Sequence, residues 1–208
     1  MKKHIQGLYA ITDQQLIAPK KFAARVKQVL QGGAQIVQYR DKSQQHQLRF
    51  EQASIVVDLC KKFGAISIIN DDIELAKIVN ADGVHIGTDD DELSYARQEL
   101  GEQKIIGVSC YADLSLAEQT VADSADYVAF GSIFASPTKP QAPIAGLDIL
   151  HQAKQSLRVP IVAIGGITLD NLDDVVSSGA DAVAIISGVF ANEDISQQAL
   201  QFSQAFNK

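Results

Sequence analysis

The stretch PIVAIGGITLDNLDDVVSSGADAVAIISG, residues 160–188, contains two short apolar runs separated by a segment with helical spacing. The runs PIVAIG (160–165) and AVAIIS (182–187) are nearly continuous in apolar character, which is typical of strands buried on both faces. One helix face between them is formed by Leu172, Val175 and Val176. Asp170 is the expected N-cap of this helix and Gly179 its expected stop. The stretch therefore predicts a strand–helix–strand unit with parallel strands.

Six similar apolar runs precede this unit: GLYAIT (7–12), IVQYR (36–40), ISIIN (66–70), GVHI (83–86), IIGVS (105–109) and YVAFG (127–131). Helical spacing recurs between them, clearest in two faces: Phe22, Val26, Val29 and Leu30, ended by Gly32 and Gly33, and then Leu48, Ile55, Leu59 and Phe63. Eight strand–helix repeats in 208 residues predict an α/β fold, a single (β/α)8 TIM barrel. A doubly wound open sheet is the alternative, but it usually has fewer strands. No linker composition interrupts the chain, so we expect one domain over residues 1–208.

The composition and charge exclude several kinds of partner. The formal net charge of -7 disfavours nonspecific binding to nucleic acid or to an anionic membrane. The N-terminal segment MKKHIQGLYAITDQQ lacks the long apolar stretch of a signal peptide, and no window approaches the roughly 18 apolar residues of a membrane span. We therefore expect a cytoplasmic protein in which Cys60 and Cys110 are buried thiols. The oligomeric state stays open, and it includes a homo-oligomer.

Polar and glycine residues follow the predicted strands, where the active site of a (β/α)8 barrel lies. In chain order they are Gln38, Arg40 and Lys42; Asn70, Asp71 and Asp72; Asp89, Asp90 and Asp91; Ser109; Ser136, Thr138 and Lys139; Gly165 and Gly166; and Ile186, Ser187 and Gly188. Gln38, Arg40 and Lys42 occupy alternate positions and can point the same way. This convergence towards one mouth predicts an active site.

Each group also has a structural interpretation. Arg40 and Lys42 are also consistent with solvated loop charges. Asp72 and one of Asp89 to Asp91 are also consistent with helix N-caps. The glycines suit tight turns. His85 is consistent with a packed, hydrogen-bonded histidine, and Cys110 is consistent with an inert thiol. Lys139 stands between Pro137 and Pro140, and a cation on so rigid a segment indicates a fixed anionic partner.

The charges around the mouth predict two anionic groups. Barrels frequently bind phosphate after the seventh and eighth strands, and SGVF (187–190) suits the short extra helix of such sites. Asp71 and Asp90 would repel a phosphate unless a cation lay between, and Mg²⁺ prefers oxygen ligands of this kind. With Arg40, Lys42 and Lys139 nearby, we expect a magnesium-bound diphosphate beside a separate monophosphate.

Eight segments resemble the motifs of the thiamine-phosphate synthase family, in order and at similar spacing: GLYAITD, QYRDK, IINDD, GVHIGTDD, GVSCY, AFGSIFASPTKP, VAIGGIT and AVAIISGVF. The resemblance implies a transferase that joins 4-amino-2-methyl-5-hydroxymethylpyrimidine diphosphate to 4-methyl-5-(2-phosphoethyl)thiazole and releases pyrophosphate.

The resemblance also implies the roles of individual residues. It assigns the pyrimidine diphosphate to Gln38, Tyr39, Arg40, Asp41, Lys42, Asn70, Ser109 and Lys139. It assigns Mg²⁺ to Asp71 and Asp90, and the thiazole phosphate to Ser136, Pro137, Thr138, Gly166, Ile186 and Ser187. Within these sets it implies catalytic roles for Arg40, Lys42, Ser109 and Lys139.

Two positions depart from the family pattern. Ser136 replaces a threonine but keeps the hydroxyl, and Thr88 stands where a glutamine is usual, which leaves Asp89 as an alternative to Asp90. The closest rival is the related thiazole tautomerase, a proton-transfer enzyme with no use for the magnesium pair or for Gln38, Arg40 and Lys42. A non-catalytic ligand-binding barrel is the second rival, but the charged residues around the diphosphate are all present.

Overall fold

The computed structural model describes residues 4–87, 90–135 and 143–206, although the side chains of Asp90 and Asp91 are not described. Eight parallel strands close into a barrel in the order of the chain, so the predicted (β/α)8 barrel is confirmed. The strands are β1 (Gly7–Ile11), β2 (Ile36–Tyr39), β3 (Ile66–Asn70), β4 (Gly83–Ile86), β5 (Ile105–Tyr111), β6 (Tyr127–Phe130), β7 (Ile161–Ile164) and β8 (Ala182–Ile185).

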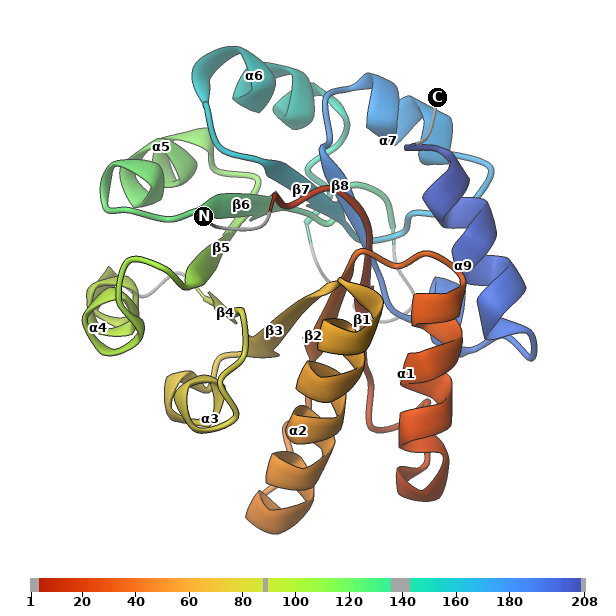
Figure 1. The fold of residues 1–208 in the computed structure, drawn as a ribbon. Helices are drawn as coiled ribbons and strands as arrows, with labels where there is room; N and C mark the ends of the chain where they lie inside the picture. Colours follow the sequence, from red (N-terminus) through yellow and green to blue (C-terminus); the bar gives the residue numbers. More distant parts are fainter. Residues whose placement is uncertain (1–3, 88–89, 136–142, 207–208) are drawn as a thin grey trace.

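The helices form a ring around this barrel, and the last long helix lies beside the first (Figure 1). They are η1 (Pro19–Lys21), α1 (Phe22–Gln31), α2 (His46–Phe63), α3 (Ile73–Ile78), α4 (Asp90–Leu100), α5 (Leu114–Ala122), α6 (Asp148–Ser156), α7 (Leu172–Ser177), α8 (Ser187–Phe190) and α9 (Ile195–Gln204). In the described part of the chain, no helix combines the length and apolarity needed to cross a membrane.

Strand residues alternate between two hydrophobic layers. One set, with Ile36, Ile68 and Val162 among its members, fills the barrel interior. The other set, with Val37 and Ile69 among its members, packs between the strands and the helices. Successive side chains of a strand point to opposite faces of the sheet. This alternation, called parity below, decides which residues can reach the mouth from inside the barrel.

Most local expectations are confirmed. Gly32 is the C-cap of α1, and Phe22, Val26, Val29 and Leu30 form its buried face. The residues SGVF form the short helix α8. Asp72 caps α3 by accepting a hydrogen bond from the Leu75 N–H, at 2.8 Å.

One local expectation is wrong and another holds only in part. Asn171, not Asp170, is the N-cap of α7; its side chain accepts from the Thr168 N–H and thereby closes the preceding turn. The fully buried residues of α2 are Gln52, Ala53, Val56 and Cys60; of the predicted face, Ile55 and Leu59 pack partly buried against the core, while Phe63 is 42% exposed. Since α2 is amphipathic with large apolar side chains on both flanks, the spacing alone selected a face rotated from the buried one.

Candidate functional site

The closed barrel brings the strand-end residues that the structure describes to one mouth. Asn70 at the end of β3 lies opposite His85 of β4, and Ile11 of β1 lies opposite Gln38 of β2. Ser109 of β5 lies opposite Ala129 of β6. Gln38 is almost fully buried, whereas Asn70 and Ser109 are partly exposed. The parity of the strands turns Gln38, Asn70 and Ser109 towards the interior, so these three predicted site residues are grouped.

A chain of hydrogen bonds inside the barrel joins Gln38 to Ser109. Gln38 Nε2 donates to Tyr9 Oη at 2.8 Å, and Tyr9 Oη lies 2.9 Å from Tyr127 Oη. Tyr127 Oη lies 2.9 Å from His85 Nδ1, and His85 Nε2 lies 2.9 Å from Ser109 Oγ. These five side chains come from β2, β1, β6, β4 and β5, and we call them the barrel relay.

Burial governs the acid–base state of the relay. It lowers the pKa of His85 from 6.5 to about 4, because the imidazolium loses its hydration inside the barrel. Burial also raises the pKa of Tyr9 and of Tyr127. At neutral pH the relay therefore contains a neutral imidazole and two protonated phenols. These uncharged groups are linked to one another by hydrogen bonds only.

Tyr9, Tyr127 and the connecting role of His85 are site features that the sequence interpretation missed. The signal was present for both tyrosines, since each occupies an alternate, inward position of an apolar strand. A second signal was Gly107, the residue of β5 opposite Tyr127. A Cβ atom on Gly107 would lie 1.9 Å from Cζ of Tyr127, so the glycine makes room for the tyrosine ring.

Tyr39 is not brought to the interior. Its ring packs edge-to-face against Phe22, with centroids 5.8 Å apart, in the layer between barrel and helices. Its hydroxyl donates to Gln52 Oε1 at 3.2 Å, and burial raises the pKa of this phenol. A ligand in the mouth would meet the backbone of Tyr39 rather than its ring.

The next three residues form the rim after β2. The Arg40 N–H donates to Thr12 Oγ1 at 3.0 Å, which ties the rim to the end of β1. Asp41 Oδ1 accepts from the Ser43 N–H at 2.6 Å, so this carboxylate closes the turn that leads to α2. Arg40 is partly exposed and Lys42 is exposed.

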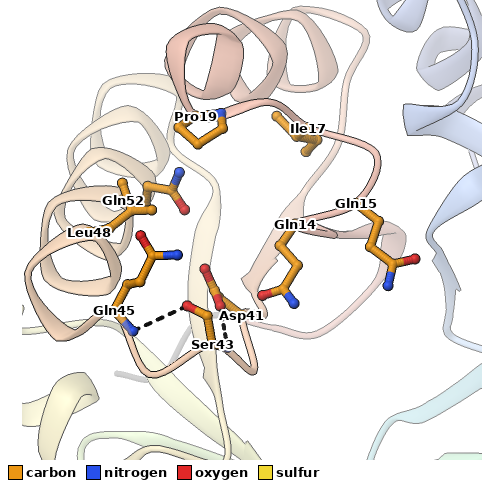
Figure 2. A pocket seen from close by; sticks show the side chains of 9 residues that line it. All are labelled: Gln14, Gln15, Ile17, Pro19, Asp41, Ser43, Gln45, Leu48 and Gln52. Atoms are coloured by element: carbon orange, nitrogen blue, oxygen red, sulfur yellow. Dashed lines mark hydrogen bonds between the residues drawn. The ribbon is translucent and has the colours of Figure 1, made fainter.

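A cavity of about 300 Å³ lies beside this rim, between the connection after β1 and the start of α2 (Figure 2). Gln14 and Gln15 line one side, and Gln45 and Gln52 line the other. Among the predicted site residues, Asp41 contributes to its wall. The cavity adjoins the mouth but is not the barrel axis, where the relay lies.

Asp71 is held on the rim by an unusual backbone conformation. Its φ is 62°, in the left-handed region that aspartate tolerates better than most residues, and its N–H donates to His85 O at 2.8 Å. The side chain is exposed, whereas neighbouring Asp72 is engaged by the helix cap and by Arg49, 2.6 Å away. Of these two carboxylates, Asp72 has a structural role, whereas the side chain of Asp71 faces solvent.

The second predicted metal ligand is Asp90. It begins α4, but its side chain lies outside the description, as does the alternative Asp89. No three candidate ligands cluster within the described ranges. Two carboxylates still fit Mg²⁺ chemically, because this ion often takes its remaining ligands from water and substrate phosphates.

The glycine turn after β7 is closely packed against the chain after β6. Gly165 and Gly166 have φ values of 97° and 65°. A Cβ on Gly166 would lie 2.4 Å from Ala135 O, and the Phe134 N–H donates to Gly165 O at 3.0 Å. Both positions therefore require glycine.

The turn after β8 leads directly into α8. Ile186 is the N-cap residue of this helix and Ser187 its first residue; both are partly buried. Gly166, Ile186 and Ser187 thus occupy neighbouring strand ends on the β7–β8 side of the mouth. The remaining predicted residues of the phosphate loop, Ser136, Pro137, Thr138 and Lys139, lie outside the described residues.

Cys110 does not take part in the mouth. It is fully buried on the outer face of β5, near Thr120, and burial raises the pKa of its thiol to about 11. A thiol with this pKa is unreactive at neutral pH.

Comparisons with known proteins show similarity to one family over most of the chain. A family model described as thiamine monophosphate synthase matches residues 8–189. A thiamine-phosphate synthase from Acidithiobacillus ferrooxidans is 46% identical over 206 residues, which cover 98% of this chain and 95% of that protein. One from Methylobacillus flagellatus is 48% identical over 203 residues, covering 98% and 96%.

A solved structure shows the same similarity. Thiamine phosphate pyrophosphorylase from Pyrococcus furiosus superposes with a TM-score of 0.88 at 32% identity, over 97% of this chain and 96% of that one. The similarity therefore covers the whole barrel and the strand ends around its mouth.

Proposed function

The chain belongs to the thiamine monophosphate synthase family, a family of transferases, and from that premise we propose how its barrel mouth forms thiamine phosphate. The substrates are 4-amino-2-methyl-5-hydroxymethylpyrimidine diphosphate and 4-methyl-5-(2-phosphoethyl)thiazole, and pyrophosphate is the second product. The grouping of Gln38, Asn70 and Ser109 beneath a rim that carries Asp71 is the observation that supports this proposal most directly.

The pyrimidine occupies the β2–β5 side of the mouth. Gln38, Asn70 and Ser109 offer amide and hydroxyl groups that suit the polar edge of an aminopyrimidine. Its diphosphate extends towards the rim, where Arg40, Lys42 and Lys139 supply positive charge. These local cations matter because the chain as a whole carries a net charge of -7.

The thiazole phosphate occupies the β6–β8 side. Gly166, Ile186 and Ser187 provide backbone N–H groups and a hydroxyl at neighbouring strand ends, as barrel phosphate sites commonly do. Ser136, Pro137 and Thr138 complete this subsite in the proposal. The two rings are then held close together by elements of one rigid barrel.

Asp71 and Asp90 would hold Mg²⁺, which when bound neutralises charge on the diphosphate. The bond between the pyrimidine methylene carbon and the diphosphate oxygen breaks, and pyrophosphate leaves with the electron pair. Arg40, Lys42 and Lys139 stabilise the charge that develops on this leaving group. The thiazole nitrogen then donates its lone pair to the methylene carbon, which forms the new C–N bond.

The direct test is to mix the purified protein with both substrates and Mg²⁺ and to assay thiamine phosphate and pyrophosphate together. We expect equal amounts of both products, and activity that disappears after chelation and returns when Mg²⁺ is added. Asp71→Asn should shift the Mg²⁺ requirement to higher concentration. Product formation that is unchanged after thorough chelation would contradict the magnesium assignment, and no product under any condition would contradict the reaction.

A further inference from the structure

The barrel relay contains a fixed number of hydrogens. Each of Tyr9, Tyr127 and Ser109 carries one hydroxyl hydrogen, and the neutral His85 ring carries one N–H. Tyr9 and Tyr127 are fully buried, so water cannot supply a missing donor or acceptor. The direction of one hydrogen bond in the relay therefore constrains the direction of the others.

The orientation of Gln38 sets this direction. Because Gln38 Nε2 donates to Tyr9, the hydroxyl of Tyr9 donates to Tyr127, and that of Tyr127 donates to His85 Nδ1. His85 then carries its hydrogen on Nε2 and donates it to Ser109 Oγ. The hydroxyl hydrogen of Ser109 and the amide oxygen of Gln38 are left for a ligand.

The opposite direction reverses both ends. If the Gln38 amide were rotated, Ser109 would donate to His85, and Gln38 would accept from Tyr9. The mouth would then meet an NH₂ group at Gln38 and only lone pairs at Ser109. Any mixed direction leaves a buried phenol hydrogen unpaired or sets two hydrogens against each other, which is unfavourable.

The surrounding geometry fixes the relay in place. The rings of His85 and Tyr127 are stacked, with centroids 5.6 Å apart, and the rings of Tyr9 and Tyr127 meet edge-to-face at 6.2 Å. Gly107 leaves the space that the Tyr127 ring occupies. In the described residues, the buried side-chain atoms that lack a hydrogen-bond partner are Gln28 Oε1 and Arg49 Nε, neither of which belongs to the relay.

We propose that Tyr9, Tyr127 and His85 are positioning residues that couple the orientation of the Gln38 amide to that of the Ser109 hydroxyl. The mouth then presents a hydrogen-bond acceptor at Gln38 and a donor at Ser109. This pair matches an aminopyrimidine, whose exocyclic amine donates and whose ring nitrogen accepts. The coupling itself is a property of the ligand-free protein. Its use in selecting the pyrimidine rests on the proposed function.

The first experiment examines the ligand-free protein. Nitrogen NMR of the protein labelled at its histidine rings reports which nitrogen of His85 carries the hydrogen. We expect the wild-type protein to carry it on Nε2. Gln38→Glu, whose ionised carboxylate can only accept from the Tyr9 hydroxyl, should reverse the chain of hydrogen bonds and move the hydrogen to Nδ1.

The control in this experiment is Tyr95→Phe, which removes a phenol hydroxyl from α4 that donates to Glu74 Oε1 at 2.8 Å. It should leave the His85 signals unchanged. A wild-type hydrogen on Nδ1 would overturn the assigned direction. A hydrogen that stays on Nε2 in Gln38→Glu would overturn the coupling.

The second experiment measures selectivity by calorimetry, with the pyrimidine diphosphate and an analogue that lacks the exocyclic amine. In Tyr9→Phe and in Tyr127→Phe, the ratio of the affinities for the two compounds should fall about tenfold relative to wild type, since the acceptor at Gln38 is no longer oriented. Tyr95→Phe should keep the preference. If wild-type protein binds neither compound, the proposed function fails, while the NMR result still decides the relay. If both compounds bind and the preference survives in both variants, the positioning role is wrong.

Discussion

Tyr127 can occupy the interior of the barrel because the facing residue, Gly107, has no side chain. This pairing places a large polar ring where a (β/α)8 barrel usually carries branched aliphatic residues. The ring in turn gives Tyr9 and His85 a hydrogen-bonding partner within the apolar interior. The chemistry of the mouth thus depends on a residue with no functional group.

Gly107→Ala should destabilise the fold strongly. The new Cβ would lie 1.9 Å from Tyr127 Cζ, so the ring must move, and overpacking of this kind costs about 1–3 kcal/mol in the free energy of unfolding. Urea denaturation measures the loss. Gly87→Ala is the matched control, because a Cβ at Gly87 meets nothing within 4 Å. Similar losses in the two variants would contradict the packing argument.

The burial of His85 predicts a pH dependence of stability. Its pKa is about 4 in the folded protein and 6.5 in the unfolded chain, so the unfolded chain binds more protons between these values. The stabilisation is complete above pH 6.5 and is lost as the pH falls towards 4. From pH 8 to pH 5 the loss amounts to about 2 kcal/mol.

Urea denaturation of wild type and His85→Gln at both pH values isolates this contribution. The variant should lose about 2 kcal/mol less than wild type between pH 8 and pH 5. His151→Gln, which changes an exposed histidine on α6, should follow wild type. Parallel curves for wild type and His85→Gln would show that His85 is not the group responsible.

At the scale of the elements, the acidic residues after β3 have divided roles. Asp72 caps α3 through Oδ1 and binds Arg49 of α2 through Oδ2, at 2.6 Å. One side chain therefore begins one helix and joins it to the previous helix. Asp71 is left on the rim, so the sequence IINDD supplies a structural carboxylate and an available one side by side.

Asp72→Ala should lose both interactions of this carboxylate, whereas Asp72→Asn keeps the cap oxygen and loses the ion pair. A lost cap costs about 0.5–2 kcal/mol, and the alanine variant should lose more than the asparagine variant. Asp113→Ala is the control for the cap alone, since Asp113 caps α5 by accepting from the Leu116 N–H. Thermal or urea unfolding gives the ranking. An asparagine variant as unstable as the alanine variant would show that the ion pair dominates.

At the scale of the whole molecule, closure of the barrel divides the mouth into two sides. Gln38, Asn70 and Ser109 lie on the β2–β5 side, while Gly166 and Ser187 follow β7 and β8. A change on one side should therefore affect the binding of one substrate more than that of the other. This separation follows from the order of strands around the barrel.

Gly166→Ala tests the separation. A side chain at this position, with a φ of 65° and a Cβ 2.4 Å from Ala135 O, must displace the turn after β7. The affinity for the thiazole phosphate should fall at least about tenfold, as expected when an oriented hydrogen bond is lost, while the affinity for the pyrimidine diphosphate changes little. Calorimetry with each substrate measures both. Gly64→Ala, which has a similar φ of 71° but open space at the end of α2, should change neither affinity. The reverse selectivity would show that the two substrates are assigned to the wrong sides.

The sequence by itself determined the barrel and the group of strand-end residues. Continuous apolar runs, helical spacing and terminal glycines are local signals, and eight repeats leave few other ways to bury them. Because the active site of a barrel lies at one end, the same signals selected Gln38, Asn70, Asp71 and Ser109. The roles of the magnesium and phosphate residues remain predictions of the sequence.

Only the tertiary structure decided which side chains meet inside the barrel. Tyr9 and Tyr127 are 118 residues apart, and their hydrogen bond depends on closure between strands that are distant in the chain. Tyr39 was predicted as part of a continuous motif, yet its ring points to the helices because neighbouring strand residues face opposite sides. A motif reports which residues are adjacent in the chain, whereas parity, register and closure decide which of them share the interior.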